Sequence, residues 1–213
     1  DVEDTPEGKF TEEVWNTRST LEGNPYSLSK VMAERAAWEI ADAQSRWDMT
    51  VVNPALVIGL AVGNSSTSES FVTLTQMGDG TMKSGVPALS LPAVDVRDLA
   101  EAHFAAGFTP EAKGRYIISS EDINLHQMAL LLHKKFGDRY PIPNKKVPKF
   151  LFWLLAPIVT KGKMTRKTVS RNVEIDYHFD NSKSVRELGI SYRPVEQSLH
   201  EMFQYMIDKN YFA

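Results

Sequence analysis

Apolar and small residues recur three and four positions apart between residues 26 and 44, which predicts a helix. One face of this helix carries Tyr26, Lys30, Ala33, Ala37 and Ile40. Asn24 and Pro25 precede it, and Asn at the N-cap followed by Pro at the first helical position is a common helix start. Because alanine side chains are small, we expect another helix or a sheet to approach this face closely.

A run rich in β-branched residues at 49–53 predicts a buried strand. Pro54 has no amide hydrogen for a sheet, so we expect the regular strand to end near Asn53. In open α/β sheets ligands collect at the carboxyl ends of the strands. The residues that follow Asn53 are therefore candidates for a binding site.

The remaining pattern is mainly helical. Residues 1–23 are predicted to form a loop, and residues 60–92 a loop with a short helix near 71–77. A strand is expected at 115–119, and helices at about 95–108, 125–136, 147–159, 181–188 and 195–209. Asp95 and Asp98 are interpreted as capping residues of the helix that they begin. This order predicts an α/β fold that passes into a smaller helical lobe.

Composition excludes several functions. The 213 residues carry a net charge of -3, so there is no overall basic field for nucleic acid. The chain has no cysteine, which excludes disulfides and thiolate catalysis and fits a cytoplasmic protein. The histidines lack metal-ligand spacing, so we expect no metal site.

The stretch from Lys145 to Arg171 contains eight basic residues and no acid, interleaved with an apolar run at 150–159. That run is too short to cross a bilayer, which needs about 20 residues. A helix that lies on a membrane surface or an anionic partner is one interpretation. We favour the other, in which the apolar face packs into the helical lobe, and we expect no membrane partner.

Tyr26 and Lys30 are the candidate catalytic residues, because positions four apart lie side by side on a helix. A phenol has an ordinary pKa of about 10 and exchanges protons poorly at neutral pH. A neighbouring ammonium group favours the phenolate, so the pair could pass a proton to or from a carbonyl oxygen. The spacing alone is common, and most such pairs are solvated helix surfaces.

The sequence contains, in this order, Asn24-Pro25-Tyr26-Ser27-Leu28-Ser29-Lys30, Asn53-Pro54-Ala55-Leu56-Val57-Ile58-Gly59, Val94-Asp95-Val96-Arg97-Asp98-Leu99-Ala100-Glu101-Ala102-His103, and Asn181-Ser182-Lys183-Ser184 with Leu188-Gly189. These four stretches resemble the extended short-chain dehydrogenases, in the branch with dihydroflavonol, cinnamoyl-CoA and methylglyoxal reductases. The resemblance covers nearly the whole chain. It implies the C-terminal part of a Rossmann-like, doubly wound parallel sheet plus a smaller, mainly helical substrate lobe.

By this resemblance, residues 1–60 end the dinucleotide-binding domain. Residues 61–213 form the substrate lobe, with about 93–120 returning to the sheet. Tyr26 is then the general acid/base, Lys30 assists it and binds the nicotinamide ribose, and Pro54, Ala55, Leu56 and Val57 line the nicotinamide pocket. The implied cofactor is NADP(H), with NAD(H) possible. The substrate is a small carbonyl compound, and the protein is a monomer or homodimer.

Two features of the family are missing from the sequence. No Gly-rich turn follows a strand, since Gly78-Asp79-Gly80 lies in the wrong place. The family's catalytic Ser would fall just before Asp1. The resemblance therefore implies that the 213 residues begin inside a longer chain, carry only part of an active site and are inactive alone.

Two alternatives stay open at this point. A hydroxysteroid dehydrogenase or a sugar-nucleotide epimerase would share Tyr26 and Lys30. A non-catalytic binding or regulatory protein could use the same scaffold.

Overall fold

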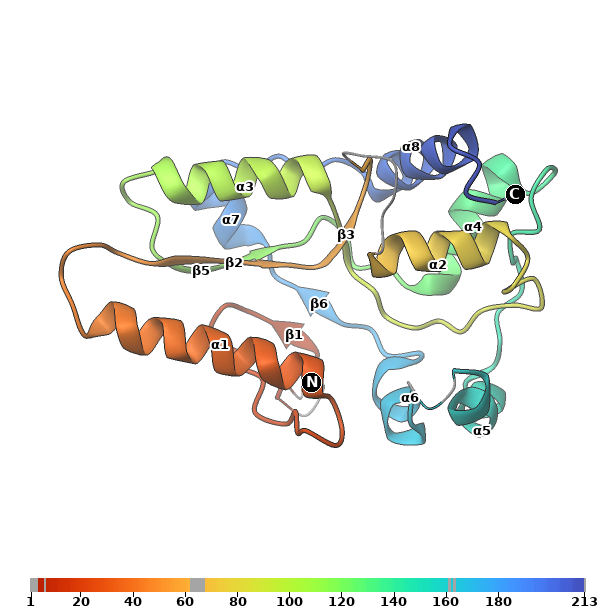
Figure 1. Ribbon diagram of the computed structural model, residues 1–213, viewed down its shortest axis with the longest axis horizontal. Coiled ribbons are helices and arrows are strands. Elements are labelled where there is room, and N and C mark those ends of the chain that lie inside the picture. Colours follow the sequence, from red (N-terminus) through yellow and green to blue (C-terminus); the bar gives the residue numbers. More distant parts are fainter. Residues whose placement is uncertain (1–3, 6, 62–67, 161, 163, 213) are drawn as a thin grey trace.

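The computed structural model describes residues 4–5, 7–61, 68–160, 162 and 164–212 (Figure 1). Its strands are β1 (Lys9–Phe10), β2 (Thr50–Pro54), β3 (Leu56–Ile58), β4 (Ala93–Asp95), β5 (Gly114–Ile118) and β6 (His178–Phe179). Its helices are α1 (Pro25–Asp42), α2 (Glu69–Gly78), α3 (Val96–Phe108), α4 (Leu125–Phe136), α5 (Lys149–Val159), α6 (Arg166–Asn172), α7 (Ser182–Leu188) and α8 (Val195–Asp208).

All strand pairs in the described residues are parallel: β2 with β5, β3 with β4, and β1 with β6. Strands β2 and β3 form one extended segment that changes partner at Ala55, whose amide donates to the Ile118 carbonyl at 3.0 Å. Figure 1 shows α3 and α1 on opposite sides of the β2–β5 pair. Parallel strands with helices on both sides are the Rossmann-type arrangement predicted from the sequence.

Strand β2 ends at Pro54, one residue after the predicted end near Asn53. Pro54 belongs to β2 and stands opposite Ile118 in the register. Since the amide of Ala55 faces β5, the nitrogen of Pro54 faces the other edge, where the structure shows no strand among the described residues. A proline is tolerated at such an edge position because no ladder hydrogen bond is lost.

The predicted helices are present, each within two residues of its expected ends, including the one in the 60–92 loop, where α2 starts at Glu69. Strands β1, β3, β4 and β6 and helix α6 were not predicted. Each of these strands has two or three residues, too few to show an alternating pattern. Residues 62–67 of the predicted loop lie outside the described residues.

Three apolar clusters hold the described elements together. The largest joins α2, α4 and α8 around Leu74, Met128, Leu132, Leu199 and Phe203, all fully buried. A second packs α3 and α7 against β5 through Ala102, Tyr116 and Leu188. The third joins α5 and α6 through Ala156, Val169 and Val173.

Helix α1 turns a different face inward than we predicted. Val31, Glu34 and Trp38 are partly covered and Ala41 is buried, whereas Tyr26 is 71% exposed and Ile40 63% exposed. The face with Tyr26 and Ile40 therefore lies open in the described part of the chain. The covered face is selected by a charged contact of Glu34, described below.

Asp95 caps α3 as predicted, since its carboxylate accepts from the Arg97 amide at 2.8 Å. The Arg97 guanidinium binds the same carboxylate and also Glu201 on α8. Asp98 was interpreted as a capping residue too, but its buried carboxylate accepts instead from the backbone amide and the guanidinium of Arg193.

Acid is expected to weaken the fold through Asp95. Burial raises the pKa of this carboxyl group, but hydrogen bonds from Arg97 and Ser198 and the charge of Arg97 outweigh it and lower the pKa to about 2. The folded pKa is thus below the unfolded value of 3.8, so the stabilisation is complete above pH 4 and is lost as the pH falls towards 2. The difference corresponds to roughly 2 kcal/mol.

Urea denaturation at a series of pH values checks this prediction. Asp95→Asn should flatten the dependence of the unfolding free energy on pH in that window. An unchanged dependence in the variant would assign it to other carboxylates.

Candidate active site

The start of α1 places Tyr26 and Lys30 side by side. The Asn24 side chain accepts from the Ser27 amide at 3.1 Å and, with Pro25 at the first position, fixes where the helix begins. The Lys30 ammonium nitrogen lies 5.3 Å from the centre of the Tyr26 ring. The predicted pair is therefore formed, in the first turn and a half of the helix, and both side chains are exposed.

A second Tyr and Lys stand at the same spacing in α8 and just after it. The Lys209 nitrogen lies 6.0 Å from the ring centre of Tyr205. Spacing alone thus does not distinguish the two pairs. Tyr26 is favoured because α1 also contacts the end of β2.

That contact is made by Glu34, one turn after Lys30. Its carboxylate binds the Arg115 guanidinium of β5 at 2.6 Å and accepts from the side-chain amide Nδ2 of Asn53 on β2 at 3.2 Å. The side chains of Glu34 and Arg115 are only 13% and 17% exposed. This pair ties α1 to both strands and so sets where Tyr26 and Lys30 lie relative to the sheet.

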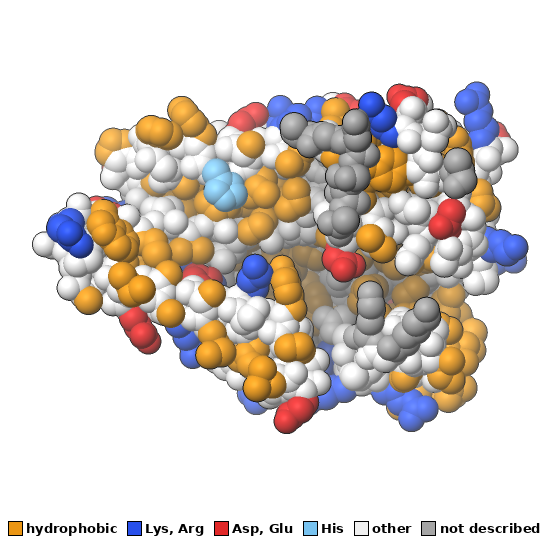
Figure 2. Space-filling model, in the orientation of Figure 1, with side chains coloured by type: hydrophobic (Ala, Val, Ile, Leu, Met, Phe, Trp, Pro, Cys, Tyr) orange, Lys and Arg blue, Asp and Glu red, His pale blue; other side chains and the backbone are white. Residues whose placement is uncertain are grey.

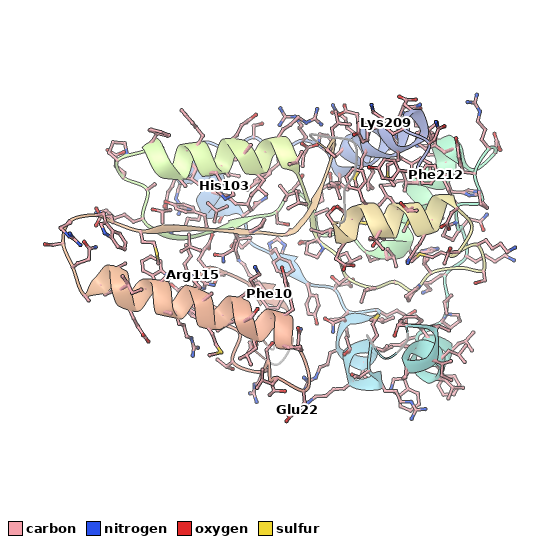
Figure 3. The ribbon with its side chains drawn as sticks, viewed as in Figure 1. Phe10, Glu22, His103, Arg115, Lys209 and Phe212 are labelled. Atoms are coloured by element: carbon pink, nitrogen blue, oxygen red, sulfur yellow. The ribbon has the colours of Figure 1, made fainter. Side chains whose placement is uncertain are left out.

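Arg115 also holds the segment that precedes α1. Its guanidinium donates to the carbonyls of Glu12 and Val14 and lies 4.1 Å from the centre of the Trp15 ring. The Glu12 carboxylate in turn accepts from the Ile117 amide of β5 at 3.1 Å. Figure 3 shows Arg115 between α1 and the β2–β5 pair, with Phe10 on the same side.

A cavity of about 180 Å³ opens at this place. Its walls are Phe10, Thr11, Glu12, Val14, Asn53, Pro54, Ala55, Arg115, Ile117 and Phe179. Ligand sites usually have about 300 to 1,000 Å³, so this cavity suits part of a ligand. Pro54 and Ala55 line it, whereas Leu56, Val57, Tyr26 and Lys30 do not.

Strands β1 and β6 close the cavity on one side. The Phe10 and Phe179 rings stack with centres 4.8 Å apart, and Lys9 binds Asp180 at 2.9 Å. Hydrogen bonds from Ser182 and Lys9 hold the pKa of the Asp180 carboxyl well below its usual range. Asp180 is therefore ionised at neutral pH and keeps the two strands paired.

Sequence reasoning missed Glu12, Glu34, Arg115 and the two phenylalanines. One signal was present, because Arg115 is a charged residue that opens an otherwise apolar strand. Its partners are up to 103 positions away in the sequence, so no local pattern connects them.

Comparison with known proteins decides the family. The model of the NAD-dependent epimerase/dehydratase family matches residues 3–119. The chain belongs to this family. Cinnamoyl-CoA reductase 1 of Petunia hybrida is 29% identical over 208 residues, which are 97% of this chain and 55% of that protein.

Two further proteins are similar to this chain. The bifunctional dihydroflavonol 4-reductase/flavanone 4-reductase of Pyrus communis is 30% identical over 88% of this chain and 46% of its own length. The crystal structure of Gre2 from Candida albicans in complex with NADPH has a TM-score of 0.70 at 22% identity, covering 94% of this chain and 58% of that one. The chain thus spans about half the length of the relatives it matches, and the Rossmann-like α/β fold is established.

The described residues fit one end of a nicotinamide cofactor. Exposed Tyr26 and Lys30 offer a hydroxyl and an ammonium group to a ribose, and Pro54 and Ala55 form an apolar wall. A pyrophosphate needs a Gly-rich turn between a strand and a helix. No such turn occurs in the described part, where Gly78 ends α2.

Metal and membrane features are also absent from the described residues. They contain no cluster of three or more His, Asp or Glu side chains that could hold a metal ion. No helix among them is long and apolar enough to span a bilayer.

Breaking the Arg115–Glu34 pair is expected to destabilise the fold. In Arg115→Met the carboxylate of Glu34 stays in a largely covered position without its cation, and we expect a loss of about 2 kcal/mol. A double-mutant cycle with Glu34→Gln, measured by urea denaturation, should give a coupling energy above about 1 kcal/mol. A coupling below about 0.5 kcal/mol would mean that the pair behaves like an exposed ion pair.

Proposed function

We propose that the protein is an oxidoreductase that reduces an aldehyde or ketone with NADPH. The observation that carries the proposal is the Tyr26–Lys30 pair at the capped start of α1, a helix tied to the end of β2 by Glu34. Family membership supports it, as do relatives whose names are cinnamoyl-CoA reductase and dihydroflavonol 4-reductase.

In this proposal NADPH supplies the hydride when bound. The Tyr26 hydroxyl donates a proton to the carbonyl oxygen as negative charge develops there, and the Lys30 ammonium favours the resulting phenolate. Lys30 also binds the nicotinamide ribose. Pro54 and Ala55 form the wall beside the nicotinamide, where an apolar surface excludes water.

The Gre2 structure with NADPH supports the choice of NADPH over NADH. A cytoplasmic location and a monomeric or homodimeric state complete the proposal.

A fluorescence titration of NADPH into the full-length protein, followed by addition of methylglyoxal or an aromatic aldehyde, tests this function. We expect binding and then net oxidation of NADPH to NADP⁺. Binding without oxidation across a panel of carbonyl compounds would contradict the reductase and support the non-catalytic alternative.

The family name keeps one sister activity open, a sugar-nucleotide epimerase. An epimerase restores its cofactor in each cycle and shows no net oxidation. Conversion of a nucleotide sugar with a constant NADPH signal would therefore favour that activity.

A further inference from the structure

Helix α5 is apolar on all sides, but only one side of it is packed. Phe152, Trp153 and Ala156 face α6 and form the cluster with Val169 and Val173. This corrects our expectation that the apolar face of residues 147–159 packs into the helical lobe. The structure buries one half of the helix surface and leaves the other half open.

The open half carries six large hydrophobic side chains in an 11-residue helix. They are Phe150 (74% exposed), Leu151 (45%), Leu154 (43%), Leu155 (38%), Ile158 (76%) and Val159 (61%). At 100° per residue they cover about half of the helix circumference without a polar interruption. A soluble helix normally has charged residues there, so an apolar surface of this size indicates a partner.

The charge around α5 indicates what kind of partner. The chain has 24 basic and 27 acidic residues, and eight of the basic ones lie between Lys145 and Arg171, where there is no acid. Lys145 and Lys167 are exposed on either side of α5 in the sequence, whereas Lys161 and Lys163 lie outside the described residues. Figure 2 shows hydrophobic side chains gathered at the end of the molecule where α5 lies, with Lys and Arg side chains beside them.

We propose that α5 lies on a membrane surface that contains anionic lipid, with its open apolar side in the boundary between headgroups and acyl chains. A helix with one apolar side and flanking Lys and Arg residues binds such surfaces through apolar burial and electrostatic attraction. Its 11 residues are too few to cross the bilayer. The interaction is therefore peripheral, and it is independent of the proposed enzymatic function.

A second copy of the chain fits this face less well. In a symmetric dimer the same surface meets itself. Two segments that carry only positive charges would then lie against each other, and like charges in contact repel. An anionic surface removes that repulsion and uses the same residues for attraction.

Vesicle co-sedimentation of the full-length protein tests the proposal. We expect binding to vesicles of phosphatidylcholine with about 30% phosphatidylserine, and much weaker binding to phosphatidylcholine alone. Raising NaCl from about 0.05 M to 0.5 M should release the protein, because salt screens the attraction. Equal binding to both vesicle types at both salt concentrations would overturn the anionic part of the proposal.

Substitutions test whether α5, rather than another exposed apolar surface, binds the vesicles. Phe150→Gln combined with Ile158→Gln should lower vesicle affinity at least tenfold, and Lys145→Glu with Lys167→Glu should abolish the preference for anionic vesicles. All four side chains are exposed, so we expect the substitutions to leave the fold unchanged. The matched control is Phe104→Gln with Phe108→Gln on α3, which are 67% and 74% exposed and should leave vesicle binding unchanged.

Two results would overturn the proposal. One is vesicle binding that persists in the Phe150 and Ile158 variant. The other is an absence of vesicle binding together with a dimer, seen by sedimentation velocity, that the same variant dissociates. The second result would assign the face to contact between copies.

Discussion

Tyr26→Phe is expected to lower the turnover number for carbonyl reduction by about 10² to 10⁴-fold, the contribution that a positioned general acid usually makes. The variant keeps the aromatic ring beside Lys30 and loses only the hydroxyl. Because the side chain is 71% exposed, the substitution should leave the free energy of unfolding unchanged. Steady-state oxidation of NADPH, with the cofactor dissociation constant measured in parallel, checks the result.

The chain provides its own control in Tyr205, which precedes Lys209 by the same four positions. Tyr205→Phe should leave turnover unchanged. Full activity in Tyr26→Phe would refute the assignment of the acid. Loss of activity in Tyr205→Phe instead would move the catalytic group to α8.

Asp98→Ala is expected to destabilise the protein by about 3 to 5 kcal/mol, as removal of one partner from a buried ion pair does. The Asp98 side chain is fully buried and accepts from the backbone amide and the guanidinium of Arg193. Without it the amide and the guanidinium lose their shared acceptor just before α8 begins. The unfolding free energy in urea measures the effect.

Glu101→Ala is the matched control, because Glu101 binds the exposed side of the same guanidinium at 3.4 Å. An exposed ion pair contributes about 0 to 1 kcal/mol. If both variants lose equal stability, Asp98 does not act as a buried partner and the explanation is wrong.

Local signals predicted several helices well because these helices carry their own start or stop. Helix α4 begins with a capping box between Asn124 and Gln127, and α7 ends at Gly189 in the left-handed conformation. The parallel strands were harder, since β3 and β4 have three residues each and are defined by their partners. Sequence pattern therefore predicted the fold class but not the change of partner at Ala55.

The candidate site, like the fold, has one part that local sequence predicts and one part that it does not. Tyr26 and Lys30 are neighbours on one helix, so their spacing predicted their contact. Glu34 and Arg115 are 81 positions apart, and only the paired strands bring them together. The side of α1 that packs also depends on this pair, which is why the predicted face was wrong.

Among the described residues no strand pairs with the edge of β2 that faces away from β5, which affects how these residues behave at high concentration. A row of unpaired backbone groups on a strand can recruit a strand from another molecule and start aggregation. On this edge the backbone of Pro54 has no N–H group to donate, whereas that of Val52, two residues earlier, has one. An incoming strand would lose a bond at the end of the segment nearest the cavity, so growth of a β-rich aggregate is hindered there by a single imino acid.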